Sequence, residues 1–274
     1  MLNFITWDID PALFKIGEFE IRYYGLFWAM SFWLGYNIVS GMFKREKLNE
    51  KLLDPLLYAV LFGAVLGARL GHVFFYDFDW YFTSDNPANE SHLLSILNIR
   101  EGGLASHGGT VGVILGVWWY ARFKIKRSML FVLDKLVAPG ALTAALIRIG
   151  NLFNSEIVGI PTDKPWGIIF KQNNESFARH PAQIYEAITY LFVFGILLFL
   201  YLKKDWFKLE GKLFGLFLVL VFVARFFIEY VKNSQEGIQE LVGDALSTGQ
   251  LLSIPFAAIG LYFYFRAGKI SGTA

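Results

Sequence analysis

The sequence predicts an all-α membrane protein that crosses the bilayer several times. Hydrophobic residues make up 55% of the 274 residues and the mean hydropathy is +0.45, which is too apolar for a soluble domain of this size. Apolar runs near the spanning length of about 20 residues recur along the chain. We therefore expect one integral membrane domain over residues 1–274 with seven transmembrane helices. Their expected ranges are about 22–41, 53–76, 104–122, 129–150, 182–202, 212–230 and 247–266.

The composition excludes several classes of function. The net charge of +2 gives no indication of nucleic-acid binding. Because the chain has no cysteine, it has no disulfide, thiolate nucleophile or thiolate metal site. The histidines follow no metal-ligand spacing, so we predict no metal, and no cofactor is indicated. The first residues lack a basic n-region, so we expect no cleavable signal peptide.

Basic residues follow alternate spans, which predicts the orientation. They cluster after the first, third, fifth and seventh spans, whereas the loop after the second span carries Asp77, Asp79, Asp85 and Glu90. Because basic loops face the cytoplasm, we expect the N-terminus outside and the C-terminus inside. The basic residues are Lys44, Arg45, Lys47, Lys51, Arg122, Lys124, Lys126, Arg127, Lys203, Lys204, Lys208, Arg266 and Lys269.

Polar residues of the first three spans lie toward the outer side in this orientation. Tyr24 begins the first span, and Arg69 lies about 12 Å below the outer end of the second, at 1.5 Å per residue. Arg69 either binds a ligand or pairs with backbone carbonyls. His107 opens the third span within GGLASHGG at 102–109. These glycines suit either an anion site at a helix N-terminus or tight packing between helices.

The later spans carry their polar residues at the same depth. The fourth span ends in the segment RIGNLFNSEIVG at 148–159, which we call the signature segment. His180, Gln183 and Glu186 open the fifth span, Arg225 and Glu229 end the sixth, and Gln250 opens the seventh. Asp134 and Lys135, near the inner end of the fourth span, are expected to form a buried structural pair.

Three arginines in the outer half favour an anionic ligand. Left unpaired at midplane depth, Arg69, Arg148 and Arg225 would together cost roughly 8–10 kcal/mol on insertion scales. Glu156, Glu186 and Glu229 offset part of that cost. A lipid phosphate is a suitable further partner, because guanidinium groups bind phosphate in a bidentate manner.

The signature segment resembles that of the prolipoprotein diacylglyceryl transferases, and the resemblance extends over most of the chain. The family usually has glycine where this chain has Ile147, often glycine at Ser155, and commonly tyrosine at Val221. We assign that tyrosine's role to no residue here. The other matching segments are IRYYGL at 21–26, GARLG at 67–71, SHGG at 106–109, RHPAQIYE at 179–186, RFFIE at 225–229 and TGQ at 248–250.

The resemblance implies an enzyme of the bacterial inner membrane whose site faces the periplasmic leaflet. Such an enzyme moves the diacylglyceryl group of phosphatidylglycerol to the lipobox cysteine thiol of a preprolipoprotein signal peptide. A thioether forms and glycerol 1-phosphate leaves. The substrate supplies the sulfur, so an enzyme without cysteine is acceptable.

The same resemblance suggests roles for individual residues. Arg148 and Arg225 would clamp the phosphate, with Asn151, Asn154 and Gly159 assisting Arg148. Arg69 would also bind the lipid, and Glu229 would bind it or only orient Arg225. Tyr24 and Glu156 would contact the headgroup or position the arginines. His107 is the candidate proton acceptor, because imidazole titrates near neutral pH. An arginine network that merely lowers the thiol pKa is the alternative.

Two other classes of function compete with this hypothesis. A transporter for an anionic solute would carry polar residues through both leaflets and often an internal repeat. The inner halves of the expected spans are mostly apolar, and no repeat is apparent. A purely structural scaffold would not need glycine, histidine and arginine from separate helices at one depth.

Overall fold

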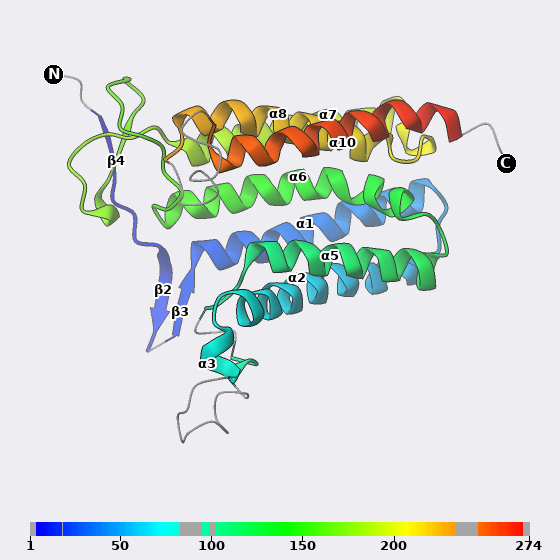
Figure 1. Cartoon of the computed structure of the whole chain (residues 1–274), viewed down its shortest axis with the longest axis horizontal. Helices are drawn as coiled ribbons and strands as arrows, with labels where there is room; N and C mark the ends of the chain where they lie inside the picture. The colour runs from blue at the N-terminus through cyan, green and yellow to red at the C-terminus, as the bar shows by residue number, and fades with distance from the viewer. Residues whose placement is uncertain (1–3, 18, 83–94, 99–101, 234–245, 271–274) are drawn as a thin grey trace. The chain divides into compact units, whose positions relative to one another are not determined.

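The computed structural model describes residues 4–17, 19–82, 95–98, 102–233 and 246–270 (Figure 1). The chain is mostly α-helical with short strands, and it divides into two compact units. Unit 1 comprises Met1–Val39 and Leu133–Ala274, and unit 2 comprises Ser40–Val132. We describe each unit by itself.

Every expected span corresponds to a helix whose bounds lie close to the predicted ones. The helices are α1 (Tyr23–Arg45), α2 (Leu53–Phe75), α5 (Ser106–Trp119, continued by a π-helical turn over Tyr120–Ile125), α6 (Met129–Phe153), α7 (Ala182–Lys203), α8 (Lys212–Ile228) and α10 (Thr248–Ile270). Within the described ranges, five helical stretches are long and apolar enough to cross a membrane. They are Glu50–Phe75, Met129–Phe153, Ala182–Lys203, Lys212–Val231 and Thr248–Ala267. A multi-pass membrane protein therefore fits the structure, and the count of seven spans stays a prediction.

Unit 2 is built on close packing of α2 against α5. Three glycines of α2 (Gly63, Gly67 and Gly71) face three of α5 (Gly108, Gly112 and Gly116) or nearby backbone. A Cβ atom added to Gly71 would lie 2.7 Å from the Cα atom of Gly108. Small residues allow this approach, as in membrane helix pairs generally. Gly108, next to His107, therefore serves helix packing, which is one of the two roles that the sequence left open.

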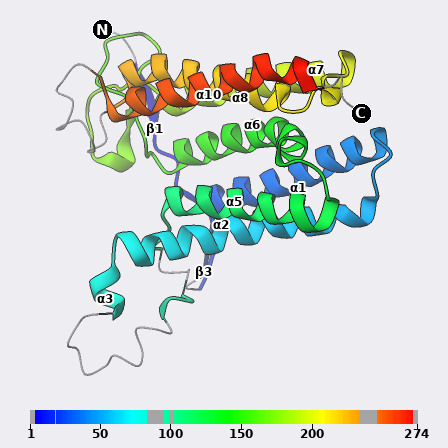
Figure 2. The ribbon, with the colours of Figure 1, turned by 45° about the vertical axis from the view of Figure 1, so that its right-hand side comes forward.

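Unit 1 contains α6, α7, α8, α10 and most of α1. In both views α8 and α10 run side by side, and α7 lies next to α8 (Figure 1, Figure 2). Asp134 of α6 is buried and accepts hydrogen bonds from the backbone N–H groups of Gly211 (2.5 Å) and Phe214 (2.8 Å) at the start of α8. This cap satisfies helix donors that would otherwise lack partners. Lys135 is buried as well, but the hydrogen bonds of Asp134 go to α8, so its pairing with Lys135 stays a prediction.

Short strands and one short helix in the structure were not predicted. The strands are β1 (Ile5–Trp7), β2 (Ala12–Ile16), β3 (Phe19–Arg22) and β4 (Ile168–Phe170), and the helix is α3 (Phe78–Phe82). β2 and β3 form an antiparallel hairpin, and β1 runs parallel to β4 with Trp7 opposite Phe170. In β4, Phe170 packs with Leu152 of the signature segment, so this sheet holds the N-terminal strand near the end of α6.

Candidate functional site

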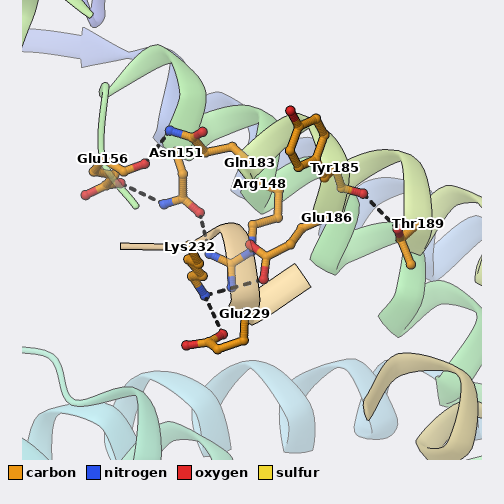
Figure 3. Close-up of polar contacts among 9 residues, drawn as sticks. All are labelled: Arg148, Asn151, Glu156, Gln183, Tyr185, Glu186, Thr189, Glu229 and Lys232. Atoms are coloured by element: carbon orange, nitrogen blue, oxygen red, sulfur yellow. Dashed lines mark hydrogen bonds and ion pairs between the residues drawn. The ribbon is translucent and has the colours of Figure 1, made fainter. Parts of the chain in front are cut away.

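Arg148 lies near the end of α6 and is held by partners on two sides. Its Nε atom lies 2.8 Å from Oε2 of Glu186 in α7, and its Nη1 group donates to Oδ1 of Asn151 (3.0 Å) (Figure 3). The Glu186 side chain is completely buried, and that of Arg148 is 17% exposed. The ion pair therefore joins two helices inside unit 1, in a setting where neither charge is easily solvated.

The rest of the signature segment folds back on itself through amide side chains. Nδ2 of Asn151 (2.7 Å) and Nδ2 of Asn154 (3.1 Å) both donate to the same carboxylate oxygen of Glu156. Gln183 of α7 donates to the backbone carbonyl of Glu156 (2.6 Å). A turn with positive φ at Ser155 (54°) and Ile157 (58°) flanks this glutamate. Glu156 thus connects to Arg148 through Asn151 while its own side chain remains exposed.

Gly159 allows a close approach of two backbones. Its N–H group donates to the carbonyl of His180 (2.9 Å), and it pairs with Lys232 in an isolated antiparallel bridge. A Cβ atom at this position would lie 2.5 Å from the carbonyl oxygen of Val231. Because its N–H is already engaged, Gly159 contributes to the site by bringing the end of the signature segment against the segment after α8.

His180 lies outside the helices, at the start of α7. Its Nδ1 atom is 2.9 Å from the hydroxyl of Tyr185, which accepts a hydrogen bond from Nε1 of Trp166 (2.7 Å). Burial, and to a smaller extent the charge of Lys164, lowers the pKa of His180. Both effects favour the neutral form of the imidazole beside the signature segment.

The end of α8 supplies further charges. Nζ of Lys232 lies 3.5 Å from Oε1 of Glu186 and 3.6 Å from Oε2 of Glu229, and its side chain is only 5% exposed. The Glu229 carboxylate rests on Gly249 of α10, where a Cβ atom would lie 2.5 Å from Oε1. Arg148, Glu186, Lys232 and Glu229 thus form a continuous chain of ion pairs (Figure 3).

Arg225 borders the same region. Its Nε atom is buried and has no hydrogen-bond partner among the residues that the structure describes. Tyr190 of α7 is 5% exposed and interacts electrostatically with both Arg148 and Arg225. We call Arg148, Glu186, Arg225, Glu229 and Lys232 the buried charge cluster.

Tyr24 and Gln250 contact other residues of unit 1. A Cβ atom at Gly150 would lie 2.8 Å from Cδ2 of Tyr24, so the tyrosine ring packs against the signature segment. Gln250 accepts from the N–H of Ser247 (2.9 Å), and the Ser247 hydroxyl accepts from the N–H of Gln250 (3.2 Å). This reciprocal pair is a capping box at the start of α10. Nε2 of Gln250 also donates to the backbone carbonyl of Phe226 in α8 (3.3 Å), so Gln250 has a structural role within α10 and between α10 and α8.

Arg69 and His107 belong to unit 2. Arg69 is buried, and its N–H groups make five hydrogen bonds, to the Tyr81 hydroxyl and to the carbonyls of Ser95, Ile96, Gly102 and Gly103. A guanidinium group has five N–H donors. These contacts match the carbonyl pairing that the sequence offered as one alternative. His107 is exposed at the start of α5.

Sequence reasoning missed Lys232 and Tyr190. Lys232 follows Glu229 by three residues, a spacing that brings side chains together in a helical turn. That spacing was the signal in the sequence for the contact between Lys232 and Glu229. It gave no indication that Lys232 also contacts Glu186. Tyr190 follows Glu186 by four residues in α7, so the two share a helix face, and that spacing was the available signal.

Comparisons with known proteins agree with one another. A family model described as prolipoprotein diacylglyceryl transferase matches residues 11–266. A protein of Chloroherpeton thalassium named phosphatidylglycerol–prolipoprotein diacylglyceryl transferase is 43% identical over 267 residues, covering 97% of this chain and 96% of the relative. Proteins of the same name from Porphyromonas gingivalis (44% identical, 97% and 95% covered) and Tolumonas auensis (40%, 97% and 98%) are similar over comparable lengths.

Proposed function

Since the chain belongs to the prolipoprotein diacylglyceryl transferase family, we propose that its buried charge cluster binds the phosphate of phosphatidylglycerol. The protein is a transferase that moves the diacylglyceryl group from phosphatidylglycerol to a prolipoprotein, a step of lipoprotein maturation. The observation that supports the assignment of the site is the charge of the cluster. The cluster contains three cationic side chains and two carboxylates, and Arg225 retains a buried Nε–H without a partner among the described residues.

The reaction explains why an excess of positive charge in the cluster would favour transfer. In our proposal the sulfur of a lipobox cysteine attacks the glyceryl carbon that carries the phosphate ester. The C–S bond forms, the C–O bond breaks, and the leaving oxygen keeps the electron pair as glycerol 1-phosphate. The phosphate group thereby gains negative charge as the reaction proceeds. Guanidinium groups already in place stabilise this charge without reorganisation.

Other residues would support this step. Glu186 orients Arg148 through the 2.8 Å ion pair, and Asn151 holds the same guanidinium from the other side. Glu156 and Asn154 fix Asn151 and present an exposed carboxylate to the glycerol headgroup. Tyr24 packs on Gly150 and positions the start of the signature segment. His107 stays our candidate for the group that accepts the thiol proton.

Arg69 has a different role in this proposal. With five N–H donors engaged by carbonyls and Tyr81, it has no donor left for a phosphate. Two of its acceptors, Gly102 and Gly103, lie just before α5. Arg69 would therefore fix the backbone segment that precedes α5, the helix that carries His107.

We further propose seven spans in the bacterial inner membrane, with the N-terminus outside, the C-terminus in the cytoplasm and the site in the outer leaflet. α1 has 23 residues. α5 has 14 residues and its π-helical turn adds 6. Both helical stretches therefore reach the spanning length of about 20 residues. The alternating basic loops support the orientation.

A transfer assay tests the function directly. Purified protein in detergent is mixed with phosphatidylglycerol and a lipobox peptide, and the mass of the peptide is measured by mass spectrometry. We expect addition of a diacylglyceryl group to the cysteine and none to a peptide with serine in its place. Absence of transfer by folded protein would contradict the proposal. Movement of an anionic solute across vesicles containing the protein would instead favour the transporter.

A further inference from the structure

Lys232 is a buried lysine that the proposed reaction does not yet use. Its side chain is 5% exposed, in a region where an unpaired ammonium group is costly to bury. It lies between two carboxylates, Glu186 at 3.5 Å and Glu229 at 3.6 Å, and points toward both (Figure 3).

The backbone around Lys232 is fixed to the signature segment. Lys232 pairs with Gly159, the N–H of Ile160 donates to the carbonyl of Val231 (3.0 Å), and the N–H of Asn233 donates to the carbonyl of Val158 (3.2 Å). This short ladder determines where the lysine side chain begins. The fixed backbone keeps the Cα atom of Lys232 next to the end of the signature segment.

Of the two carboxylates that Lys232 contacts, one pairs with an arginine of the proposed phosphate site and the other lies four residues after the second arginine. Glu186 is the direct partner of Arg148. Glu229 follows Arg225 by four residues, a spacing that places both on one face near the end of α8. Lys232 therefore contacts both the partner of Arg148 and the carboxylate that follows Arg225 in the chain.

Charge balance indicates what this link does. With Lys232, three cationic groups face two carboxylates and the cluster carries one positive charge in excess. Without it, two guanidinium groups would face two carboxylates and the cluster would be neutral. An incoming phosphate would then compete with Glu186 for Arg148 and would meet a cluster without net positive charge.

We propose that Lys232 is a positioning residue of the transfer reaction, which neutralises Glu186 and Glu229 so that Arg148 and Arg225 can bind the phosphate. This inference rests on the proposed function. Lys232 acts through the two carboxylates. Its loss weakens the use of phosphatidylglycerol without affecting the use of the peptide.

The first experiment compares Lys232→Met, Lys232→Arg and the control Lys208→Met in the full-length protein. Lys208 also forms an ion pair at a spacing of three residues, with Asp205, but it lies 65% exposed on the surface. Loss of one positive charge from a partly buried phosphate site is expected to weaken phosphate binding by about tenfold or more. We expect kcat/KM for phosphatidylglycerol to fall by about tenfold or more in Lys232→Met, with the KM for the peptide unchanged. Lys232→Arg should recover most of the loss, and Lys208→Met should match the wild type.

A second experiment separates charge from folding. The double variant Lys232→Met/Glu229→Gln removes one cation and one carboxylate and so restores the positive excess. We expect it to recover a large part of the kcat/KM lost in Lys232→Met, and we expect inhibition by glycerol 1-phosphate to strengthen in parallel. A double variant that folds as well as the wild type and yet shows no recovery would overturn the proposal, even if Lys232→Met alone fails to fold.

Two further outcomes also decide the question. Unchanged use of phosphatidylglycerol by Lys232→Met overturns the role of Lys232 while the wild type still transfers the lipid. Equal losses for lipid and peptide overturn it too, because they indicate a general structural defect. If the wild type itself transfers nothing, the proposed function fails instead, so the two failures are distinguishable.

Discussion

Glu186 of α7 lies 2.8 Å from Nε of Arg148 in α6, and its side chain is completely buried. The same carboxylate also faces Lys232, so a single glutamate balances two cationic side chains from different parts of the chain. Removing one member of a buried ion pair leaves the remaining charge without compensation, which costs about 3–5 kcal/mol. Glu186 is therefore both a structural and a positioning residue of unit 1.

We predict that Glu186→Ala lowers the free energy of unfolding by about 3–5 kcal/mol and abolishes transfer. Chemical denaturation in detergent micelles measures the first effect and the peptide assay the second. Asp205→Asn, which breaks the exposed pair with Lys208, is the control and should change stability by less than about 1 kcal/mol. A Glu186→Ala variant as stable as this control would contradict the ion-pair assignment.

Lysine in place of either arginine tests the phosphate clamp. Lysine keeps the positive charge but lacks the planar fork that binds phosphate through two parallel hydrogen bonds. We expect Arg148→Lys and Arg225→Lys to lose transfer by about a hundredfold or more while remaining folded. The measurement is kcat/KM for phosphatidylglycerol, with thermal unfolding as the test of folding. Full activity in either variant would exclude bidentate binding by that arginine.

Ser155 occupies a strained backbone conformation. Its φ is 54°, a region that costs an L-residue about 1–2 kcal/mol and costs glycine little, and its buried hydroxyl has no partner among the described residues. Glycine is also the residue that the family often has here. We predict that Ser155→Gly raises the free energy of unfolding by about 0.5–1 kcal/mol, because the greater freedom of the unfolded glycine offsets part of the gain.

Asn174→Gly is the matched control for Ser155→Gly. Asn174 has a similar φ of 56°, but asparagine tolerates this region and the residue is exposed. Its replacement should have the smaller effect in the same denaturation experiment. A destabilised Ser155→Gly protein would mean that the serine hydroxyl has a function that the described residues do not reveal.

The apolar pattern predicted the helices well because lipid-facing and buried helix faces are both hydrophobic. The predicted range 53–76 corresponds to Leu53–Phe75, and 182–202 corresponds to Ala182–Lys203. The pairing of β1 with β4 could not be predicted in this way. Each strand has three residues, and more than a hundred residues separate them, so no local pattern connects the two.

The polar contacts were predictable only where both partners are side chains in one short segment. The proximity of Asn151, Asn154 and Glu156 follows from the signature segment itself. The acceptors of Arg69 are mainly backbone carbonyls, which every residue has, so the sequence does not identify them. Sequence reasoning therefore found the arginine and left its partner undecided.

Replacement of Arg69 distinguishes a structural role from a role in lipid binding. We predict that Arg69→Gln lowers the free energy of unfolding by about 1–3 kcal/mol, because buried carbonyls lose their donors. The KM for phosphatidylglycerol should stay close to that of the wild type in the fraction that remains folded. Arg122→Gln, at an exposed arginine of the same unit, is the control. A large rise in KM without loss of stability would restore Arg69 as a phosphate ligand.

His107 provides the test of proton transfer. An imidazole accepts a proton only in its neutral form, so a histidine base predicts that kcat/KM falls at acidic pH, where an imidazole is protonated. His107→Gln should lose about a hundredfold or more in kcat/KM and should no longer show this fall. His107 lies exposed at the start of α5 and glutamine is similar in size, so folding should be unaffected. Near-normal turnover with an unchanged pH profile would exclude His107 as the base, and the arginine network would then be the group that lowers the pKa of the substrate thiol.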